Sequence, residues 1–376
     1  MFQTVLFDVD GVILSEERYF DASALTVWEM LFSPRYLGLA GDFTPAPSES
    51  AIRRIRKEVF VQDGVLSLIK ARGINANWDM VYLAFSYQLI RFLEMACRQR
   101  PQEVSELLGK EIDEQSLAQM RSWDISYTPD YAGFIADFSR GTAKRQDLLL
   151  DLNRIATERL GRKVNSFSRN SHLWDIGQRA FQEWYLGEEK FVQSTGENPL
   201  QSGKKGFLYD EIPIVSMQAL GALLGKLREA GVVLGIGTGR PHVETFEPLG
   251  ALGILDYFEP ERVVTASEVL AAERRFPDRS PLAKPQPYCY LKALLGKGTP
   301  DEEVFDVQLP LSQGRDILVV GDSVADFLAA KSMGCTFAAT LTGLSGEAAR
   351  ATFEELGADY ILKDVLELEG ILAAAR

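Results

Sequence analysis

The sequence predicts an α/β protein: a Rossmann-like parallel sheet core with helices on both faces, plus a large all-α domain inserted into it. Three observations lead to this. Residues 207–376 alternate apolar strand-like runs with amphipathic helical stretches, which is typical of a parallel sheet covered on both sides. Residues 15–206 show helical periodicity and no convincing strand alternation. A short apolar run at residues 5–7 precedes that segment, and we expect it to join the sheet.

The elements of the sheet domain follow one another along the chain. Strands are expected near residues 232–237, 262–265, 317–320, 336–340 and 359–362. Helices are expected near residues 216–230, 242–251, 287–296, 324–333, 346–356 and 364–374. Together with the first strand, residues 1–14 and 207–376 are predicted to form one α/β domain with right-handed crossovers between neighbouring strands.

Residues 15–206 are predicted to form the second, helical domain. Helices are expected at residues 16–32, 50–61, 63–71, 78–98, 113–123, 144–160 and 173–186. The exit from this domain, residues 194–206, has the Gly, Ser, Asn and Pro content of a mobile linker or an exposed loop.

Two groups of side chains in the helical domain have a structural interpretation that we favour over a functional one. Its tryptophans could stack on a base or sugar, but helices of this size need large apolar side chains for their core. These residues are Trp28, Trp78, Trp123, Trp174 and Trp184. A basic group could reach a distal acid of a substrate, but it also fits a solvated helix face. It comprises Arg53, Arg54, Arg56 and Lys57.

Two carboxylates lie at the end of the first strand. Asp8 and Asp10 follow the apolar run one residue apart, and Gly11 allows a sharp turn directly after them. Two like charges this close repel each other unless a cation lies between them or one of them is protonated. The pair therefore predicts either a Mg2+ site or a nucleophile beside a general acid. In isolation, an Asp-x-Asp-Gly sequence also fits an ordinary turn.

A second acidic strand end lies far along the chain. An apolar run ends at Gly321, and Asp322, Ser323 and Asp326 then open a helix. Asp322 is placed to supply an oxygen ligand to a hard cation, and Asp326 lies near the same helix start. Ser323 and Asp326 also have the spacing of a capping box, so Asp326 has two possible roles, which can coexist.

Two further positions suit a phosphate group. Thr238 and Gly239 follow the strand at 232–237, and Arg240 comes next, before a proline that can begin a helix. A hydroxyl and free backbone N–H groups at such a helix start favour an anion. Lys284 lies at another apparent helix entry, where its charge could neutralise crowded carboxylates and a transferring phosphoryl group.

In this order, the four motifs resemble the haloacid dehalogenase-like hydrolase superfamily, specifically its phosphatases with a helical cap between the first and second motifs. The resemblance implies that Asp8 is the nucleophile that forms an aspartyl-phosphate, and that Asp10 is the general acid and base. It implies phosphate contacts from Thr238, Gly239, Arg240 and Lys284. It implies a Mg2+ site made by Asp8, the backbone carbonyl of Asp10, Asp322 and Asp326, the last either directly or through a neighbour.

The resemblance also separates reaction types. Members that cleave carbon–halogen bonds lack an acidic residue two positions after the nucleophile, so Asp10 favours phosphoryl transfer to and from a leaving alcohol that needs a proton. The expected function is a Mg2+-dependent phosphatase for a small phosphorylated metabolite. Two alternatives remain: a phosphomutase of the β-phosphoglucomutase type, and a non-catalytic ligand-binding or regulatory protein on the same scaffold.

The composition of the chain limits which classes of partner, location and metal site are expected. The net charge of −13, without long clusters of Lys and Arg, argues against a nucleic-acid-binding surface. No segment resembles a membrane span or a secretory signal, so a cytoplasmic location is expected. Three widely spaced cysteines fit reduced core residues. Only His172 and His242 are present, which excludes a multi-histidine zinc site within one chain. His242 could line the mouth of the site, but we favour its interpretation as a helix-start residue. The oligomeric state is left open.

Overall fold

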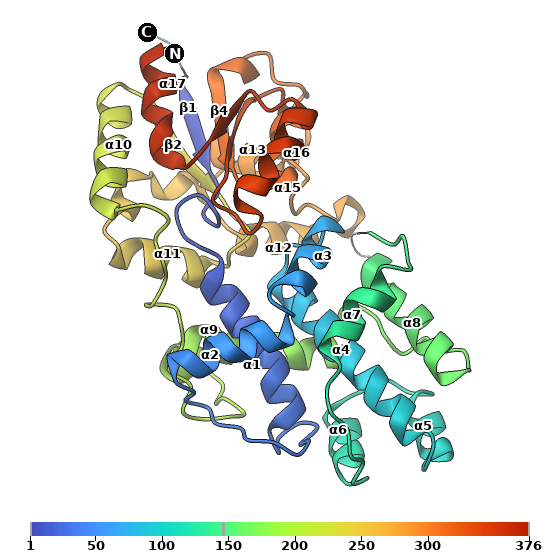
Figure 1. The fold of residues 1–376 in the computed structure, drawn as a ribbon. Coiled ribbons are helices and arrows are strands. Elements are labelled where there is room, and N and C mark those ends of the chain that lie inside the picture. Colours follow the sequence, from blue (N-terminus) through green and yellow to red (C-terminus); the bar gives the residue numbers. More distant parts are fainter. Residues whose placement is uncertain (1, 145–146, 375–376) are drawn as a thin grey trace. The chain divides into compact units, whose positions relative to one another are not determined.

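The computed structural model of this chain describes residues 2–144 and 147–374 (Figure 1). It divides into two compact units: residues up to Glu16 together with those from Leu208 onward form the first, and residues from Glu17 to Phe207 form the second. None of the helices in the described part of the chain has both the length and the apolar character needed to cross a membrane.

The first unit is built on a parallel sheet of six strands in the order β3-β2-β1-β4-β5-β6. The strands are β1 Thr4–Phe7, β2 Val233–Gly237, β3 Val263–Val264, β4 Ile317–Gly321, β5 Thr336–Thr340 and β6 Tyr360–Leu362. Strand β1 lies between β2 and β4, with Phe7 in register with Ile236 and Val320. Because all strands run the same way, their carboxyl ends meet at one edge of the sheet. The predicted α/β sheet is thereby confirmed.

Helices cover both faces of this sheet (Figure 1). They are α10 Met217–Glu229, α11 His242–Ala251, α12 Ala266–Arg275, α13 Tyr288–Leu295, α14 Asp301–Phe305, α15 Val324–Met333, α16 Arg350–Leu356 and α17 Leu368–Ala374. Short 3-10 turns lie at Leu255–Tyr257, Pro260–Arg262, Pro277–Arg279, Gly314–Asp316, Gly346–Ala349 and Val365–Glu367. Helices α12 and α14 have no counterpart among the expected elements.

Alternation along the central strands creates two separate cores. Val5 and Phe7 pack in a cluster with Leu224 of α10, whereas Leu6 packs in the opposite cluster with Tyr290 of α13. Successive side chains of a strand point to opposite faces, so a strand buried on both sides must be apolar throughout. This explains why β1 is a continuous apolar run. Cys289 and Cys335 are free and buried in one of these cores, as the cysteine spacing predicts, while Cys97 of the second unit is half-buried.

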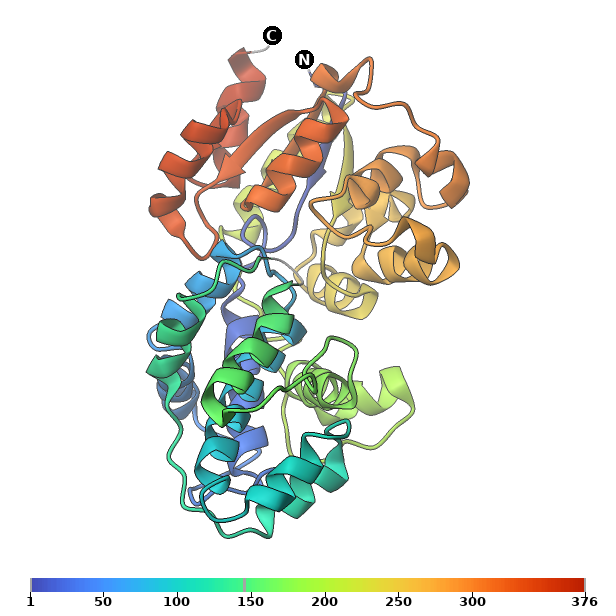
Figure 2. The same ribbon diagram turned by 90° about the vertical axis from the view of Figure 1, so that its right-hand side faces the viewer.

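The second unit contains helices and loops alone among its described residues (blue to green in Figure 2). Its helices are α1 Glu17–Phe32, α2 Glu49–Val59, α3 Gly64–Ala71, α4 Asn77–Ala96, α5 Pro101–Leu107, α6 Glu114–Arg121, α7 Tyr131–Phe138, α8 Asp147–Leu160 and α9 His172–Thr195. Helices α5 and α7 were not expected. The predicted helix at 144–160 begins later, and its residues 145–146 lie outside the described part of the chain.

Helices α1, α4 and α9 pack against one another and form the centre of this unit. The rings of Tyr19 on α1 and Tyr185 on α9 stack with their centroids 4.4 Å apart. Trp123, Trp174 and Trp184 are buried, which confirms core packing for these three, whereas Trp28 and Trp78 are half-buried. The solvated-face interpretation of the basic group holds for Arg53, Arg54 and Lys57, which are exposed.

Arg56 departs from the solvated-face interpretation. Its side chain is only 15% exposed, and it pairs with Asp63 at 2.8 Å and with Asp21 at 3.5 Å. The guanidinium also lies over the ring of Phe20, 5.3 Å from the centroid. Arg56 therefore belongs to the packing between α1 and α2, because carboxylates and an aromatic face on its neighbours replace water around the charge.

The exit segment is also more ordered in its contacts than its composition predicts. Residues 194–198 are exposed, but Lys204 is fully buried. Helix α9 is kinked at Gly187, which has φ +77°, and a Cβ there would lie 2.4 Å from the carbonyl oxygen of Lys205. Glu188 N–H donates to the carbonyl of Lys204 at 2.9 Å. The end of the predicted linker is thus fixed against the kink, and the expectation of a mobile or exposed segment is wrong for it.

Candidate active site

The first strand delivers Asp8 to the carboxyl edge of the sheet. Its N–H donates to the carbonyl of Val320 at 2.9 Å, which continues the pairing with β4, and its Oδ1 accepts the N–H of Val9 at 2.7 Å. Gly11 turns the chain away with φ +68°. A Cβ at Gly11 would lie 2.4 Å from Oδ2 of Asp322, so glycine is needed both for the backbone conformation and for this close approach.

Lys284 connects the carboxylate of Asp8, directly after β1, with that of Asp326 in the first turn of α15. Its Nζ lies 2.9 Å from Oδ2 of Asp8 and 2.7 Å from Oδ1 of Asp326. The ammonium also lies over the ring of Tyr290, 4.7 Å from the centroid. Lys284 thus lies against two crowded carboxylates, as expected, while its contact with a phosphoryl group stays a prediction.

Asp326 is held by the protein on both oxygens. Oδ1 accepts from Lys284 and from the hydroxyl of Tyr290 at 2.8 Å, and Oδ2 accepts from the hydroxyl of Ser323 at 2.7 Å. Ser323 Oγ in turn accepts the N–H of Asp326 at 3.2 Å, so the predicted capping box at the start of α15 is confirmed. Gly321 makes room for this carboxylate, since a Cβ there would lie 2.4 Å from that of Asp326.

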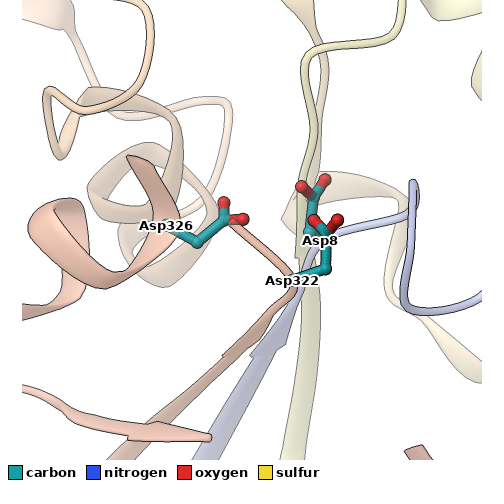
Figure 3. Close-up of side chains that lie close together, drawn as sticks. All are labelled: Asp8, Asp322 and Asp326. Carbon is teal, nitrogen blue, oxygen red and sulfur yellow. The ribbon is translucent and has the colours of Figure 1, made fainter. Parts of the chain in front are cut away.

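Three carboxylates converge at this edge of the sheet. One oxygen each from Asp8, Asp322 and Asp326 lies within 4.8 Å of the others. Figure 3 shows Asp8 and Asp322 side by side at the ends of neighbouring strands, with Asp326 pointing toward them from the start of the helix. The backbone of Gly343 approaches the half-buried carboxylate of Asp322 closely, because a Cβ at Gly343 would lie 1.9 Å from its Oδ2.

Burial and charge act on the two partners of Lys284 in opposite directions. Burial raises the pKa of Asp8, and the neighbouring carboxylates of Asp326 and Asp10 raise it further, against the attraction of Lys284. Burial also acts to raise the pKa of Asp326, but Lys284 and the hydroxyls of Ser323 and Tyr290 outweigh it, so that pKa is lowered. Lys284 and the two hydroxyls thus stabilise the ionised form of Asp326, whereas burial still disfavours the ionised form of Asp8.

A divalent cation fits this donor set. Carboxylate and carbonyl oxygens are the ligands that Mg2+ prefers, and the glycine-lined space around Asp322 brings its oxygen close to the loop that carries Asp8 and Asp10. A cation there would offset the charge that Asp8 buries. The protein already engages both oxygens of Asp326, so a direct contact of this residue with a cation stays a prediction.

Thr238 and Gly239 lie at the end of β2. Thr238 is buried, its N–H donates to the carbonyl of Val264 at 3.0 Å, and its Oγ accepts the N–H of Arg240 at 3.2 Å. A Cβ built on Gly239 would meet no atom within 4 Å, so this backbone borders open space. A hydroxyl and an uncrowded N–H at this point suit an oxyanion. His242 begins α11, as the sequence predicts, and its ring stacks on Phe246 with centroids 4.0 Å apart.

Arg240 is placed differently from its prediction. The side chain has no exposed surface, and its guanidinium is 2.6 Å from Asp10 and 2.6 Å from Glu211. A phosphate contact by Arg240 would compete with these two ion pairs, and it stays a prediction. Asp10 itself is 21% exposed at its side chain and lies at the same loop as Asp8.

Several neighbours of the site had no recognisable sequence signal. Thr340 and Thr342, at and after the end of β5, both donate to the carbonyl of Gly11 and fix the turn beyond Asp10. Tyr290 and Gly343 support Asp326 and Asp322, and Glu211 holds Arg240. Such residues follow no motif spacing, because their role is defined by which strands become neighbours. Only a correct strand order could have indicated them.

Comparisons with known proteins identify the family and a similar fold. The model of the family described as haloacid dehalogenase-like hydrolase matches residues 2–334. A crystal structure from the Northeast Structural Genomics Consortium is 36% identical, covers 99% of this chain and 98% of that chain, and superposes with a TM-score of 0.82. No curated protein matches the sequence.

Other solved structures have a lower sequence identity to this chain and a lower TM-score. A hydrolase from Pseudomonas syringae is 14% identical, with 99% of this chain and 98% of that chain covered and a TM-score of 0.41. A HAD family hydrolase from Deinococcus radiodurans R1, crystallised with bound phosphate and sodium, is 15% identical, with 100% and 96% covered and a TM-score of 0.39. These two are similarities only.

Proposed function

This chain belongs to the haloacid dehalogenase-like hydrolase family, and from that premise we propose that it is a Mg2+-dependent phosphatase for a small phosphorylated metabolite. The observation that carries the proposal is the environment of Asp8. Its carboxylate lies at the end of the central strand, 2.9 Å from Lys284, with Asp322 beside it and the loop of Asp10 directly after it. A nucleophile, a cation to align it and a second carboxylate for proton transfer are thus gathered at one point.

In the proposed reaction, a carboxylate oxygen of Asp8 attacks the phosphorus atom and the bond from phosphorus to the leaving oxygen breaks. Asp10 gives a proton to that oxygen, so an alcohol departs and Asp8 carries an acyl phosphate. Water then attacks the phosphorus atom, Asp10 accepts the proton from the water, and the bond between phosphorus and Asp8 breaks. Inorganic phosphate and the original carboxylate are restored.

The remaining residues hold the phosphoryl group. The hydroxyl of Thr238 and the N–H of Gly239 would donate to its oxygens, and Lys284 would keep Asp8 and the phosphate aligned while Asp326 fixes the lysine. Mg2+, held by Asp8, Asp322 and the backbone carbonyl of Asp10, would supply positive charge against the phosphate oxygens. Carbon–halogen cleavage releases a halide, which needs no proton. The presence of Asp10 as a proton donor therefore favours phosphoryl transfer over carbon–halogen cleavage.

The proposal is tested by phosphate release from a panel of sugar, nucleotide and small-acid phosphates with Mg2+. We expect release by the wild type, and a loss of at least about a thousandfold in Asp8→Asn, which lacks a nucleophilic oxygen anion. Asp10→Asn should slow both steps, so that phosphoenzyme detected by mass spectrometry decays more slowly. Asp278→Asn, which changes an exposed carboxylate of the same unit, is the matched control and should keep full activity.

Two results would contradict the proposal. Substantial turnover by Asp8→Asn would show that Asp8 is not the nucleophile. Consumption of a substrate by the wild type without any phosphate release would point instead to transfer between hydroxyl groups.

A further inference from the structure

The side chain of Arg240 is the largest fully buried one in the described part of the chain, and the proposed reaction does not use it. Burying a guanidinium is unfavourable unless its charge and its N–H groups are matched. Here each direction of the planar group has an acceptor. Asp10 lies on one side, and Glu211 with the backbone carbonyl of Glu244 lies on the other. An acceptor for each of its three nitrogens gives the guanidinium a fixed orientation.

The contact with Asp10 is directional. Nε and Nη2 of Arg240 both donate to the same oxygen, Oδ1, at 2.9 and 2.6 Å. Two donors from a rigid fork fix the position of this oxygen. Because these donors occupy Oδ1, the proton that Asp10 exchanges would be carried by its other oxygen, Oδ2.

The contact with Glu211 sets the position of the guanidinium. Nη1 donates to Oε1 of Glu211 at 2.6 Å and, more weakly, to the carbonyl of Glu244 at 3.3 Å. The Glu211 side chain is only 3% exposed, so solvent screens this pair little. Glu211 also lies on a braced segment. Ser15 N–H donates to the carbonyl of Ile212 at 2.8 Å, and Ile214 N–H donates to that of Ile13 at 3.0 Å.

We propose that Glu211 and Arg240 are positioning residues for proton transfer: Glu211 holds Arg240, and Arg240 holds Oδ1 of Asp10 so that Oδ2 is presented to the leaving oxygen and then to water. The proposal rests on the phosphatase function proposed above. It differs from the expected phosphate contact of Arg240, because it gives the guanidinium an effect on the two proton transfers by Asp10 and no contact with the phosphate that Asp8 attacks.

That distinction gives a test with two probes of similar shape. The leaving group of p-nitrophenyl phosphate departs as a stable anion and needs no proton, whereas that of phenyl phosphate is much more basic and is helped by Asp10. Rapid-mixing kinetics should follow phosphorylation of Asp8 by each probe, in the wild type and in Glu211→Gln. We expect the variant to be within about twofold of wild type with p-nitrophenyl phosphate and about 10- to 100-fold slower with phenyl phosphate.

Further variants keep the test independent of folding. Glu211→Gln preserves the size of the side chain and removes its charge, and Arg240→Lys preserves the charge and removes the fork; both should show the same dependence on the leaving group. Glu247→Gln changes a glutamate on α11 that binds the hydroxyl of Tyr209 at 2.8 Å, and it should behave as wild type with both probes. Thermal unfolding of each variant identifies any loss of folded protein.

The outcomes separate the two proposals. If the wild type phosphorylates Asp8 and Glu211→Gln slows both probes equally, or neither, Glu211 is not a positioning residue, and the phosphatase function stands. If the wild type forms no phosphoenzyme and no p-nitrophenol, the proposed function fails, and the role of Glu211 and Arg240 in proton transfer fails with it.

Discussion

Each unit of this protein contains a lysine held between two buried carboxylates. In the sheet unit, Nζ of Lys284 lies 2.9 Å from Asp8 and 2.7 Å from Asp326. In the helical unit, Nζ of Lys204 lies 2.7 Å from Glu29 and 2.8 Å from Glu183. The pairs differ in access to solvent: the side chains of Lys284 and Asp8 are 12% and 11% exposed, whereas Lys204 and both of its partners are 0% exposed.

This difference in solvent exposure distinguishes a cluster that can meet a ligand from one that only stabilises the fold. A carboxylate with remaining exposed surface can meet a ligand, and Asp8 has that surface. A sealed trio can only hold chain segments together. Glu29 lies on α1, Glu183 on α9 and Lys204 on the exit segment, and Glu183 also accepts the N–H of Leu200 at 2.8 Å. Buried charge alone therefore does not mark an active site, and the remaining access must be considered as well.

The largest effect should come from removing the cation of the sealed trio. Lys204→Met keeps most of the packing volume but leaves Glu29 and Glu183 buried without a counter-charge. We expect the free energy of unfolding of the helical unit to fall by about 3–5 kcal/mol. All tryptophans of the sequence lie in this unit, so tryptophan fluorescence during urea unfolding reports on it directly.

Two other lysines serve as controls for that measurement: Lys205, which is next along the chain, and Lys284, which lies between two carboxylates in the sheet unit. Lys205→Met changes an exposed lysine next along the chain and should leave the urea midpoint nearly unchanged. Lys284→Met should abolish most phosphatase activity and leave the tryptophan-detected transition of the helical unit in place. An unchanged midpoint in Lys204→Met would mean that the trio of Lys204, Glu29 and Glu183 contributes nothing to stability. The structural role assigned to this trio, in contrast to the Lys284 cluster, would then be wrong.

An effect of intermediate size is expected on Mg2+ binding at Asp322 in the sheet unit. In Gly343→Ala the new Cβ would overlap Oδ2 of Asp322, which it would approach to 1.9 Å, so the carboxylate must move. We expect Mg2+ affinity, measured by isothermal titration calorimetry, to fall about 10- to 100-fold. Gly250→Ala, whose Cβ would meet only Leu255 at an ordinary 3.8 Å, should bind Mg2+ as the wild type does. Equal affinities in both variants would argue against Asp322 as a ligand.

The smallest effect concerns the pH dependence of the sealed trio. Burial raises the pKa of Glu29 from 4.5 to about 7, although Lys204 opposes the shift. The folded state then binds this proton more tightly than the unfolded state does. Stability must therefore fall as the pH rises from about 4.5 to 7, by at most about 1.4 kcal/mol per pH unit for one proton.

Urea unfolding followed by tryptophan fluorescence across that range tests the sign. Glu29→Gln should flatten this part of the profile and should be more stable than the wild type at pH 8. Asp175→Asn, which changes an exposed carboxylate on α9, should retain the wild-type slope. A wild-type profile that rises with pH between 5 and 7 would show that Glu29 is ionised in the folded state.

Sequence reasoning reached the sheet and the motif residues because both depend on local patterns. Apolar runs mark strands buried on both faces, and Asp8, Asp322 and Lys284 stand at fixed places relative to strand or helix ends. Short helices such as α14 have too few residues to show a period. The kink at Gly187 and the burial of Lys204 depend on distant partners, so the composition of residues 194–206 predicted the wrong environment for the end of that segment.

The position of β1 at the centre of the sheet bears on how the protein is made. Its neighbours, β2 and β4, begin at residues 233 and 317, so a ribosome completes the whole helical unit before β1 has either partner. The helical unit is one continuous stretch of chain whose α-helices are closed by local contacts, and such chains fold quickly. During synthesis the strand that precedes Asp8 therefore remains unpaired, and the Asp8 carboxylate reaches its place in the site only in the last stage of folding.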